Sequence, residues 1–181
     1  FCDRLLPSGR YVSCDYGTQN ATVFLLWNKG TDGVWYCIRE YYYSGRTEGK
    51  QKTDSEYADD LESWLEETKI KGIIVDPSAA SFIAELRKRG YKVVKAKNNV
   101  EDGIRVVGTK LNQEAIIFAD SCVNTIQEFG SYIWDEAAAA HGEDRPVKEH
   151  DHAMDALRYF VYTILNNQTA IIRSKRKAGF H

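Results

Sequence analysis

A turn between two β-rich segments is the feature that most constrains the fold of this chain. Residues 21–27 and 34–43 are dominated by β-branched and aromatic side chains, which favour strands. Residues 28–33 lie between them and combine asparagine, aspartate and glycine, as is typical of a hairpin turn. Residues 11–18 form a third strand-like run before them. We therefore expect the first three strands to form an antiparallel meander.

Beyond the meander, short apolar runs alternate with segments of helical character. Residues 72–75 and 91–96 are expected as strands, the first a buried parallel strand, and 114–119 as a brief extended segment. Helices are expected after Thr53 and over residues 78–89, 100–111, 121–140 and 151–166. This order predicts an α/β fold: a mixed sheet of three antiparallel strands and then parallel strands, with helices on both faces. The strand at 11–18 is expected in the centre.

The bulk properties are those of a globular protein with one domain. The chain has 181 residues, 43% of them hydrophobic and 28% charged, and a net charge of −2, so charge alone does not indicate nucleic-acid binding. The four cysteines show no paired spacing and are expected to be reduced thiols, and no apolar run approaches the roughly 18 residues of a membrane span. We expect a single domain over 1–181, with 1–10 as a lead-in and 167–181 as a flexible tail. Since the chain starts with Phe1, we expect a piece of a longer protein.

The run 149–159 concentrates charged side chains at the start of the last expected helix. Asp151 and Asp155 are four residues apart and share a helix face, and His152 is expected within reach of Asp155. Acids packed on one helical turn repel each other unless a cation lies between them. Asp151 itself suits the capping position of the helix, which we favour over metal ligation for this residue.

Two further acids follow apolar strand-like runs, Asp15 after the first strand and Asp76 after the strand at 72–75. The carboxyl ends of neighbouring strands are where α/β sheets place their ligands. We expect Asp15, Asp76 and Asp155 to converge on two divalent cations that prefer oxygen ligands.

Each candidate also has a purely structural interpretation. Asp15 could form a turn, Asp76 could cap the following helix, and Asp155 could pair with Arg158. His152 could be an ordinary surface residue of its helix rather than a proton donor or a group that supports the site. The residues alone leave these alternatives open.

Four stretches together resemble the ribonuclease H-like nuclease superfamily, and within it the C-terminal nuclease domain of the large terminase subunit of tailed phages and prophages. These stretches are residues 15–17, 75–79, 101–104 and 151–159, of which the last is the most specific. The resemblance implies that Asp15, Asp76 and Asp155 are catalytic metal ligands for two Mg or Mn ions. It implies that His152 is a further catalytic residue and that Asp151 is a possible ligand.

The resemblance also implies a function: a metal-dependent endonuclease that cuts concatemeric double-stranded viral DNA during genome packaging by two-metal-ion hydrolysis. Its implied partners are double-stranded DNA, the portal, the small terminase subunit and an N-terminal ATPase domain, in the cytoplasm of the host bacterium and without a membrane. No phosphate-binding loop of the Gly-x-x-x-x-Gly-Lys-Ser/Thr type occurs in this chain, so the ATPase domain is expected to be missing from it.

Four basic residues are candidates for contact with DNA phosphates: Lys95, Lys97, Arg46 and Lys50. Their alternative role is plain solubility.

Three other functions stay open. One is another ribonuclease H-like nuclease, of the resolvase or transposase type. Another is a non-catalytic docking module of the packaging motor. The run 15–18 also occurs in the phosphate loops of actin-like and sugar-kinase folds, but the chain has no room for the second domain that those folds need.

Overall fold

The computed structural model describes residues 5–18, 20–131 and 151–166. Its sheet has six strands in the order β5-β4-β1-β2-β3-β6. The strands are β1 (Leu5–Asp15), β2 (Ala21–Gly30), β3 (Trp35–Ser44), β4 (Ile73–Val75), β5 (Val93–Lys95) and β6 (Ile116–Phe118). The strands β1, β2 and β3 pair antiparallel, whereas β4 joins β1, β5 joins β4 and β6 joins β3 in parallel. The predicted mixed sheet with a central first strand is confirmed.

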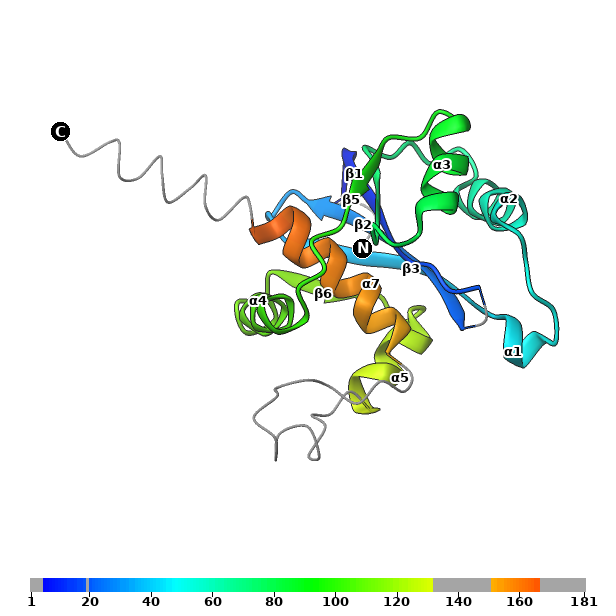
Figure 1. Ribbon diagram of the computed structural model, residues 1–181. Helices are drawn as coiled ribbons and strands as arrows, with labels where there is room; N and C mark the ends of the chain where they lie inside the picture. The colour runs from blue at the N-terminus through cyan, green and yellow to red at the C-terminus, as the bar shows by residue number, and fades with distance from the viewer. Residues whose placement is uncertain (1–4, 19, 132–150, 167–181) are drawn as a thin grey trace.

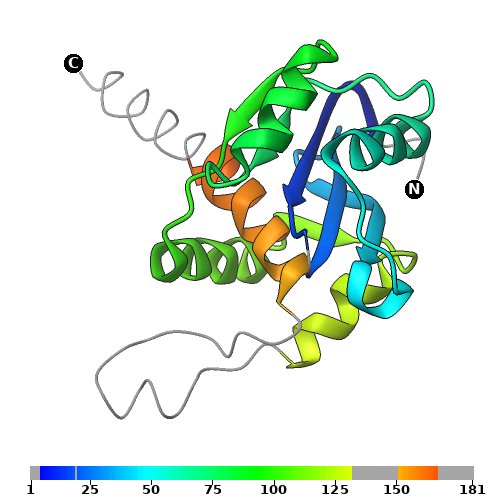
Figure 2. The same ribbon diagram turned by 45° about the vertical axis from the view of Figure 1, so that its right-hand side comes forward.

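Helices cover both faces of this sheet (Figure 1). They are α1 (Gly45–Glu48), α2 (Asp54–Leu65), α3 (Ala80–Lys88), α4 (Val100–Asn112), α5 (Val123–Ser131) and α7 (His152–Phe160), which continues as a π-helical turn over Val161–Leu165. Figure 2 shows α2 and α3 on one face, and α7 lying across the other with α4 and α5 beside it.

The alternation of side chains along β1 assigns its residues to two separate cores. Val12 and Cys14 pack with α2 and α3. Ser13 and Asp15 therefore point to the opposite face, where Trp27 stacks on Phe160 of α7 with ring centroids 4.3 Å apart. This alternation places the Asp15 carboxylate, at the end of the central strand, on the face that α7 covers.

Some boundaries differ from the expected ones. β1 already begins at Leu5, because Leu5 pairs with Gly30 across an irregularity in the register before Arg10. The expected loop at 44–52 contains α1, and α5 is described only to Ser131, so the rest of the expected helix to 140 and the tail at 167–181 lie outside the described residues.

Three cysteines in the described ranges, Cys14, Cys37 and Cys122, are buried free thiols. Over those same ranges, every helix falls short of the length or the apolar character of a membrane span.

Candidate metal centre

Asp15 and His152 form the centre of the candidate site. Asp15 is the last residue of β1 and His152 the first residue of α7, and His152 Nδ1 lies 3.0 Å from Asp15 Oδ2. The side chains of His152 and Asp15 are 22% and 16% exposed, so the pair is largely shielded from water. The surface interpretation of His152 is therefore wrong, and its partner is Asp15 rather than the expected Asp155.

The charge of Asp15 is poorly stabilised. Burial raises the pKa of Asp15 to about 6, the neighbouring Asp155 and Asp151 push it in the same direction, and the hydrogen bond with His152 opposes them. That same hydrogen bond raises the pKa of His152 above its ordinary value, against the effect of burial. The pair therefore holds protons to a higher pH than its members would in water.

Asp155 lies one turn further along α7 and forms the ion pair that the sequence left open. Arg158 Nη2 donates to Asp155 Oδ1 at 2.7 Å, and Arg158 Nη1 donates to the carbonyl oxygen of Asn98 at 3.0 Å. Gly103 of α4 makes room for this guanidinium, since a Cβ there would lie 2.6 Å from Arg158 Cγ. The arginine thus fixes the position of the Asp155 carboxylate.

Asp76 follows β4 directly, at the carboxyl edge where β1 also ends. Its Oδ1 accepts a hydrogen bond from the backbone N–H of Ser78 at 2.8 Å, and its Oδ2 one from Asn98 Nδ2 at 3.3 Å. Because α3 starts only at Ala80 and Ala79 occupies its capping position, Asp76 does not cap that helix. Burial alone would raise the pKa of Asp76, but hydrogen bonds from Ser78, Asn98 and Tyr159 hold it below its ordinary value.

Tyr159 is influenced by all three acids. Burial raises the pKa of this tyrosine well above its usual range, and so do the charges of Asp155, Asp15 and Asp76. All three carboxylates therefore act on the same phenol, which is 5% exposed. Tyr159 belongs to the run 151–159, but its sequence position did not indicate this central place.

Asp151 lies beside this group but does not act as expected. It occupies the capping position of α7 without a capping hydrogen bond from its side chain. Its charge raises the pKa of both Asp15 and His152, so its carboxylate lies near that pair. The favoured capping role is wrong for the side chain of this residue.

Glu128 of α5 caps the helix instead. Its Oε2 accepts hydrogen bonds from the backbone N–H groups of Ala153 at 2.7 Å and Met154 at 3.2 Å. The residue is 4% exposed. Burial raises its pKa, and hydrogen bonds from Tyr42 and the α7 backbone oppose this shift. Sequence reasoning missed Glu128, and we find no local signal that would have indicated it.

The donor set fits a hard divalent cation. Asp15, Asp76 and Asp155 offer carboxylate oxygens from three separate elements, which is the ligand chemistry that Mg²⁺ and Mn²⁺ prefer. A cation would also offset the repulsion that raises the pKa of Asp15. As the side chains lie, no three His, Cys, Asp or Glu of the described residues are gathered closely enough to share one ion. Metal binding would therefore require these carboxylates to move closer together.

Two predicted DNA-binding residues lie near this edge of the sheet. Lys95 ends β5 and is in register with Val75, the residue before Asp76. The backbone N–H of Lys97 donates to Thr163 Oγ1 at 2.9 Å, and its ammonium group lies 5.7 Å from the centre of the Tyr162 ring. Both lysines are exposed.

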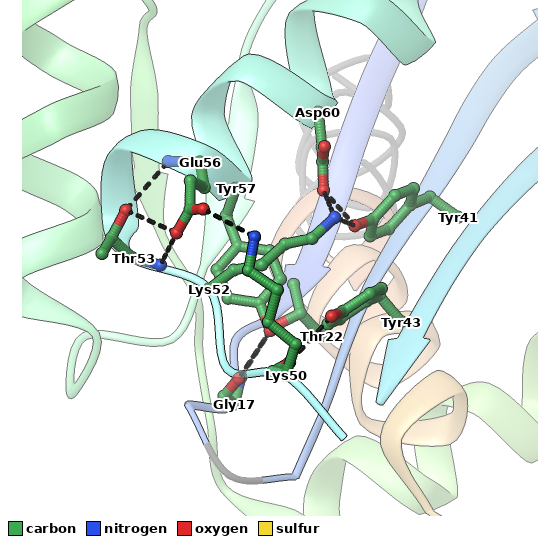
Figure 3. Close-up of polar contacts among 10 residues, drawn as sticks. All are labelled: Gly17, Thr22, Tyr41, Tyr43, Lys50, Lys52, Thr53, Glu56, Tyr57 and Asp60. Carbon is green, nitrogen blue, oxygen red and sulfur yellow. Dashed lines mark hydrogen bonds and ion pairs between the residues drawn. The ribbon is translucent and has the colours of Figure 1, made fainter. Parts of the chain in front are cut away.

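The other two predicted DNA-binding residues lie at and after α1. This helix follows β3, whose carboxyl end is at the same edge as that of β1, because β1 and β3 both run antiparallel to β2. Arg46 belongs to α1 and is exposed. Lys50 forms an ion pair with Glu56 at 3.2 Å, which Figure 3 shows beside the start of α2. The role of all four basic residues in DNA binding stays a prediction.

The mixed sheet is that of the expected ribonuclease H-like fold, and known structures share it. The large terminase of a thermophilic bacteriophage is 58% identical to this chain, with a TM-score of 0.85 over 87% of the chain and 40% of that protein. Structures of the same terminase also contain ADP or ATP-γ-S. The large terminase nuclease of the thermophilic phage G20c with bound cobalt shares the fold at 17% identity and a TM-score of 0.63, over 89% of this chain and 84% of that one.

A curated relative gives the same result. The chain is 27% identical over 157 residues to the large terminase subunit of Escherichia phage T5. This match spans 84% of the chain but only 34% of the T5 protein. No protein-family model matches the chain. The resemblance to the nuclease domain of large terminase subunits, expected from the four motifs, is confirmed.

Proposed function

We propose that this chain is a metal-dependent endonuclease that cuts concatemeric double-stranded viral DNA during genome packaging. The observation that carries the proposal is a set of contacts between α7 and the carboxyl edge of the sheet. His152 contacts Asp15 at the end of β1. Arg158 binds both Asp155 and the carbonyl oxygen of Asn98, whose side chain donates to Asp76 after β4. The similarity to large terminases supports DNA packaging as the setting.

The three acids would hold two Mg²⁺ or Mn²⁺ ions. Bound there, such ions activate a water and stabilise the leaving oxygen of a phosphodiester. Asp76 suits this role, because hydrogen bonds from Ser78, Asn98 and Tyr159 favour its ionised form and lower its pKa. Asp155 is oriented by Arg158, whose hydrogen bonds to Asp155 and Asn98 fix the carboxylate relative to the loop before α4.

The chemistry also needs proton transfer, and His152 suits it. Its raised pKa keeps the imidazole protonated to higher pH than in a free histidine. The 3.0 Å hydrogen bond to Asp15 holds the ring in one orientation. We assign to His152 the proton donation to the leaving oxygen, and to Asp151 a supporting negative charge at the same end of α7.

The wider setting is also part of the proposal. We propose double-stranded DNA as the substrate, and the portal, the small terminase subunit and an ATPase domain as partners in the host cytoplasm. The chain spans 40% of the terminase to which it is 58% identical, and the structures of that terminase with ADP and ATP-γ-S support an ATP-binding part elsewhere in proteins of this kind. Lys95, Lys97, Arg46 and Lys50 are proposed contacts to DNA phosphates.

The direct test is nicking of supercoiled plasmid by the chain with Mn²⁺, Mg²⁺ or EDTA. We expect cutting with the metals, none with EDTA, and none by Asp76→Ala with any metal. Duplex DNA should be preferred over an RNA–DNA hybrid and a four-way junction, which separates this function from those of other ribonuclease H-like enzymes. A wild-type chain as inert as Asp76→Ala with every metal and protein concentration would instead indicate a non-catalytic docking module.

A further inference from the structure

We propose that Glu128 is a positioning residue that sets the first turn of α7, and through it His152 and Asp155, for metal binding. This inference rests on the proposed function of the site. Glu128 acts through the backbone of the helix that carries two of the site residues, rather than as a ligand itself.

The geometry couples Glu128 directly to the reactive turn. Its Oε2 accepts from the backbone N–H groups of Ala153 at 2.7 Å and Met154 at 3.2 Å. His152 immediately precedes these two residues and Asp155 immediately follows them. A carboxylate at the amino end of a helix is also stabilised by the helix dipole. A displacement of Glu128 would therefore move both site side chains.

Because Glu128 is buried, its carboxylate needs hydrogen-bond partners. Glu128 is 4% exposed, and a buried carboxylate is costly unless hydrogen bonds satisfy it. Its second oxygen, Oε1, accepts from the hydroxyl of Tyr42 at 2.9 Å. Tyr42 belongs to β3, so Glu128 joins the start of α7 to the rigid sheet.

A second carboxylate anchors the helix that presents Glu128. Glu40 of β3 accepts from the backbone N–H and the side-chain amide of Asn124, at 2.7 and 2.8 Å. It also accepts from the backbone N–H and the hydroxyl of Thr125, at 2.9 and 2.7 Å. Glu40 and Tyr42 are two residues apart on β3 and so share a face. The sheet thus fixes α5 at its start, and α5 with Tyr42 fixes the start of α7.

This arrangement explains why Asp151 makes no side-chain cap. A helix is most often capped by the residue at its own N-terminus. Here Asp151 holds that position without a capping bond, and Glu128 from another helix satisfies the backbone. The backbone at the start of α7 is thus held by Glu128 rather than by the residue in its own capping position.

The test compares Glu128→Gln and Glu128→Ala with Thr53→Ala in the 181-residue chain. Thr53 caps α2 on the opposite face: its hydroxyl accepts from the backbone N–H of Glu56 at 3.2 Å (Figure 3). The readouts are the dissociation constant of Mn²⁺ by titration calorimetry, the cutting rate, and hydrogen exchange of the Ala153 and Met154 amides. All are measured at a temperature where each variant is folded.

We expect Glu128→Ala to weaken Mn²⁺ binding by about 10-fold or more, as losing a group that orients metal ligands does. Glu128→Gln should fall between Glu128→Ala and wild type, because one amide oxygen replaces two carboxylate oxygens. Exchange at Ala153 and Met154 should accelerate in both variants. Thr53→Ala should lower the melting temperature while leaving Mn²⁺ affinity within about twofold of wild type.

The proposal is overturned if Glu128→Ala binds Mn²⁺ within about twofold of the wild-type affinity. Such a change would fall well short of the loss expected for a positioning group. If that variant does not fold, Glu128→Gln decides in the same way, and unchanged affinity overturns it. A wild-type chain that neither binds Mn²⁺ nor cuts DNA would instead overturn the proposed function and the inference with it. Wild-type binding and cutting with unaffected Glu128 variants would overturn the inference alone.

Discussion

The two faces of the sheet differ in where their charged side chains lie. On the face covered by α2 and α3, the buried cluster consists of hydrophobic side chains, and contacts of charged groups lie at its edge: Tyr41 and Lys52 both bind Asp60 there (Figure 3). On the face covered by α7, charged side chains lie inside: Glu128 is 4% and Arg158 3% exposed. Both faces also bury a hydrophobic cluster, so a hydrophobic core alone does not require these buried charges.

The difference separates the scaffold from the candidate site. Buried charges are costly unless they are paired or bind ions. Asp15, Asp155 and Glu128 all lie on the α7 face, and the raised pKa of Asp15 reflects part of that cost. The α2 face therefore serves as a reference: equivalent changes there should affect stability without affecting cutting.

The largest expected effect is on cutting. Asp15→Asn should lower the rate of Mn²⁺-dependent plasmid nicking by on the order of 10³-fold, because one oxygen ligand loses its charge. Asp76→Ala and Asp155→Ala should do the same. The matched control is Asp60→Asn, which removes a half-buried carboxylate from the α2 face. Its nicking rate should stay close to that of wild type, and retained cutting by any of the first three variants would remove that residue from the site.

The second effect is on stability without metal. In the folded chain the pKa of Asp15 is about 6 against an ordinary 3.8, so the folded state binds more protons between these values. Stability from this group is therefore present at low pH and lost as pH rises from about 4 to 6, by at most about 3 kcal/mol. The raised pKa of His152 acts in the same direction at higher pH: its contribution is present below pH 6.5 and is lost as pH rises through its folded pKa.

Thermal unfolding in EDTA tests the direction of this pH dependence of stability. Asp15→Asn should melt above wild type at a pH of about 8, and the gain should shrink towards a pH of about 4. Asp60→Asn should melt below wild type at the higher pH, since it leaves Lys52 without its carboxylate partner. A lower melting temperature for Asp15→Asn at the higher pH would mean that Asp15 is a structural acid like Asp60.

A smaller effect concerns two glycines of α4. A Cβ at Gly103 would lie 2.6 Å from Arg158 Cγ, whereas a Cβ at Gly108 would have no atom within 4 Å apart from its chain neighbours and the nearby backbone of its own helix. Gly103→Ala should therefore cost about 1–3 kcal/mol and slow cutting through a displaced Arg158. Gly108→Ala should stabilise the helix by up to about 1 kcal/mol without changing the rate. Urea unfolding and nicking assays measure both, and equal behaviour of the two variants would contradict the role given to Arg158.

The smallest effect should come from the capping box of α2. Thr53 and Glu56 exchange hydrogen bonds there, and Thr53→Ala should cost about 1 kcal/mol. The nicking rate should not change. Urea unfolding gives the cost, and a loss of cutting would show that the α2 face is not a passive scaffold.

Local patterns predicted much of the fold. The hairpin turn and the buried run before Asp76 were sufficient to place β1 in the centre of a mixed sheet, with Asp15 at its end. The early start of β1 was missed, because the proline, serine and glycine at 7–9 are typical of a loop. Pairing of Leu5 with Gly30 overrides that local preference.

The candidate site was predicted less completely, because part of it depends on distant residues. Asp155 was identified from its helix, whereas the partner of His152 is 137 residues away in the sequence. Glu128 caps a helix that begins beyond the end of its own, and periodicity carries no information about such a contact. The central place of Tyr159 likewise follows only from the packing of α7 on the sheet.

The most direct test of the central claim is anomalous diffraction from crystals of the chain grown with Mn²⁺. We predict manganese bound by carboxylate oxygens of Asp15, Asp76 and Asp155 at about 2.0–2.3 Å, the distances usual for such ions. Manganese bound elsewhere, or no manganese at saturating concentration, would contradict this prediction.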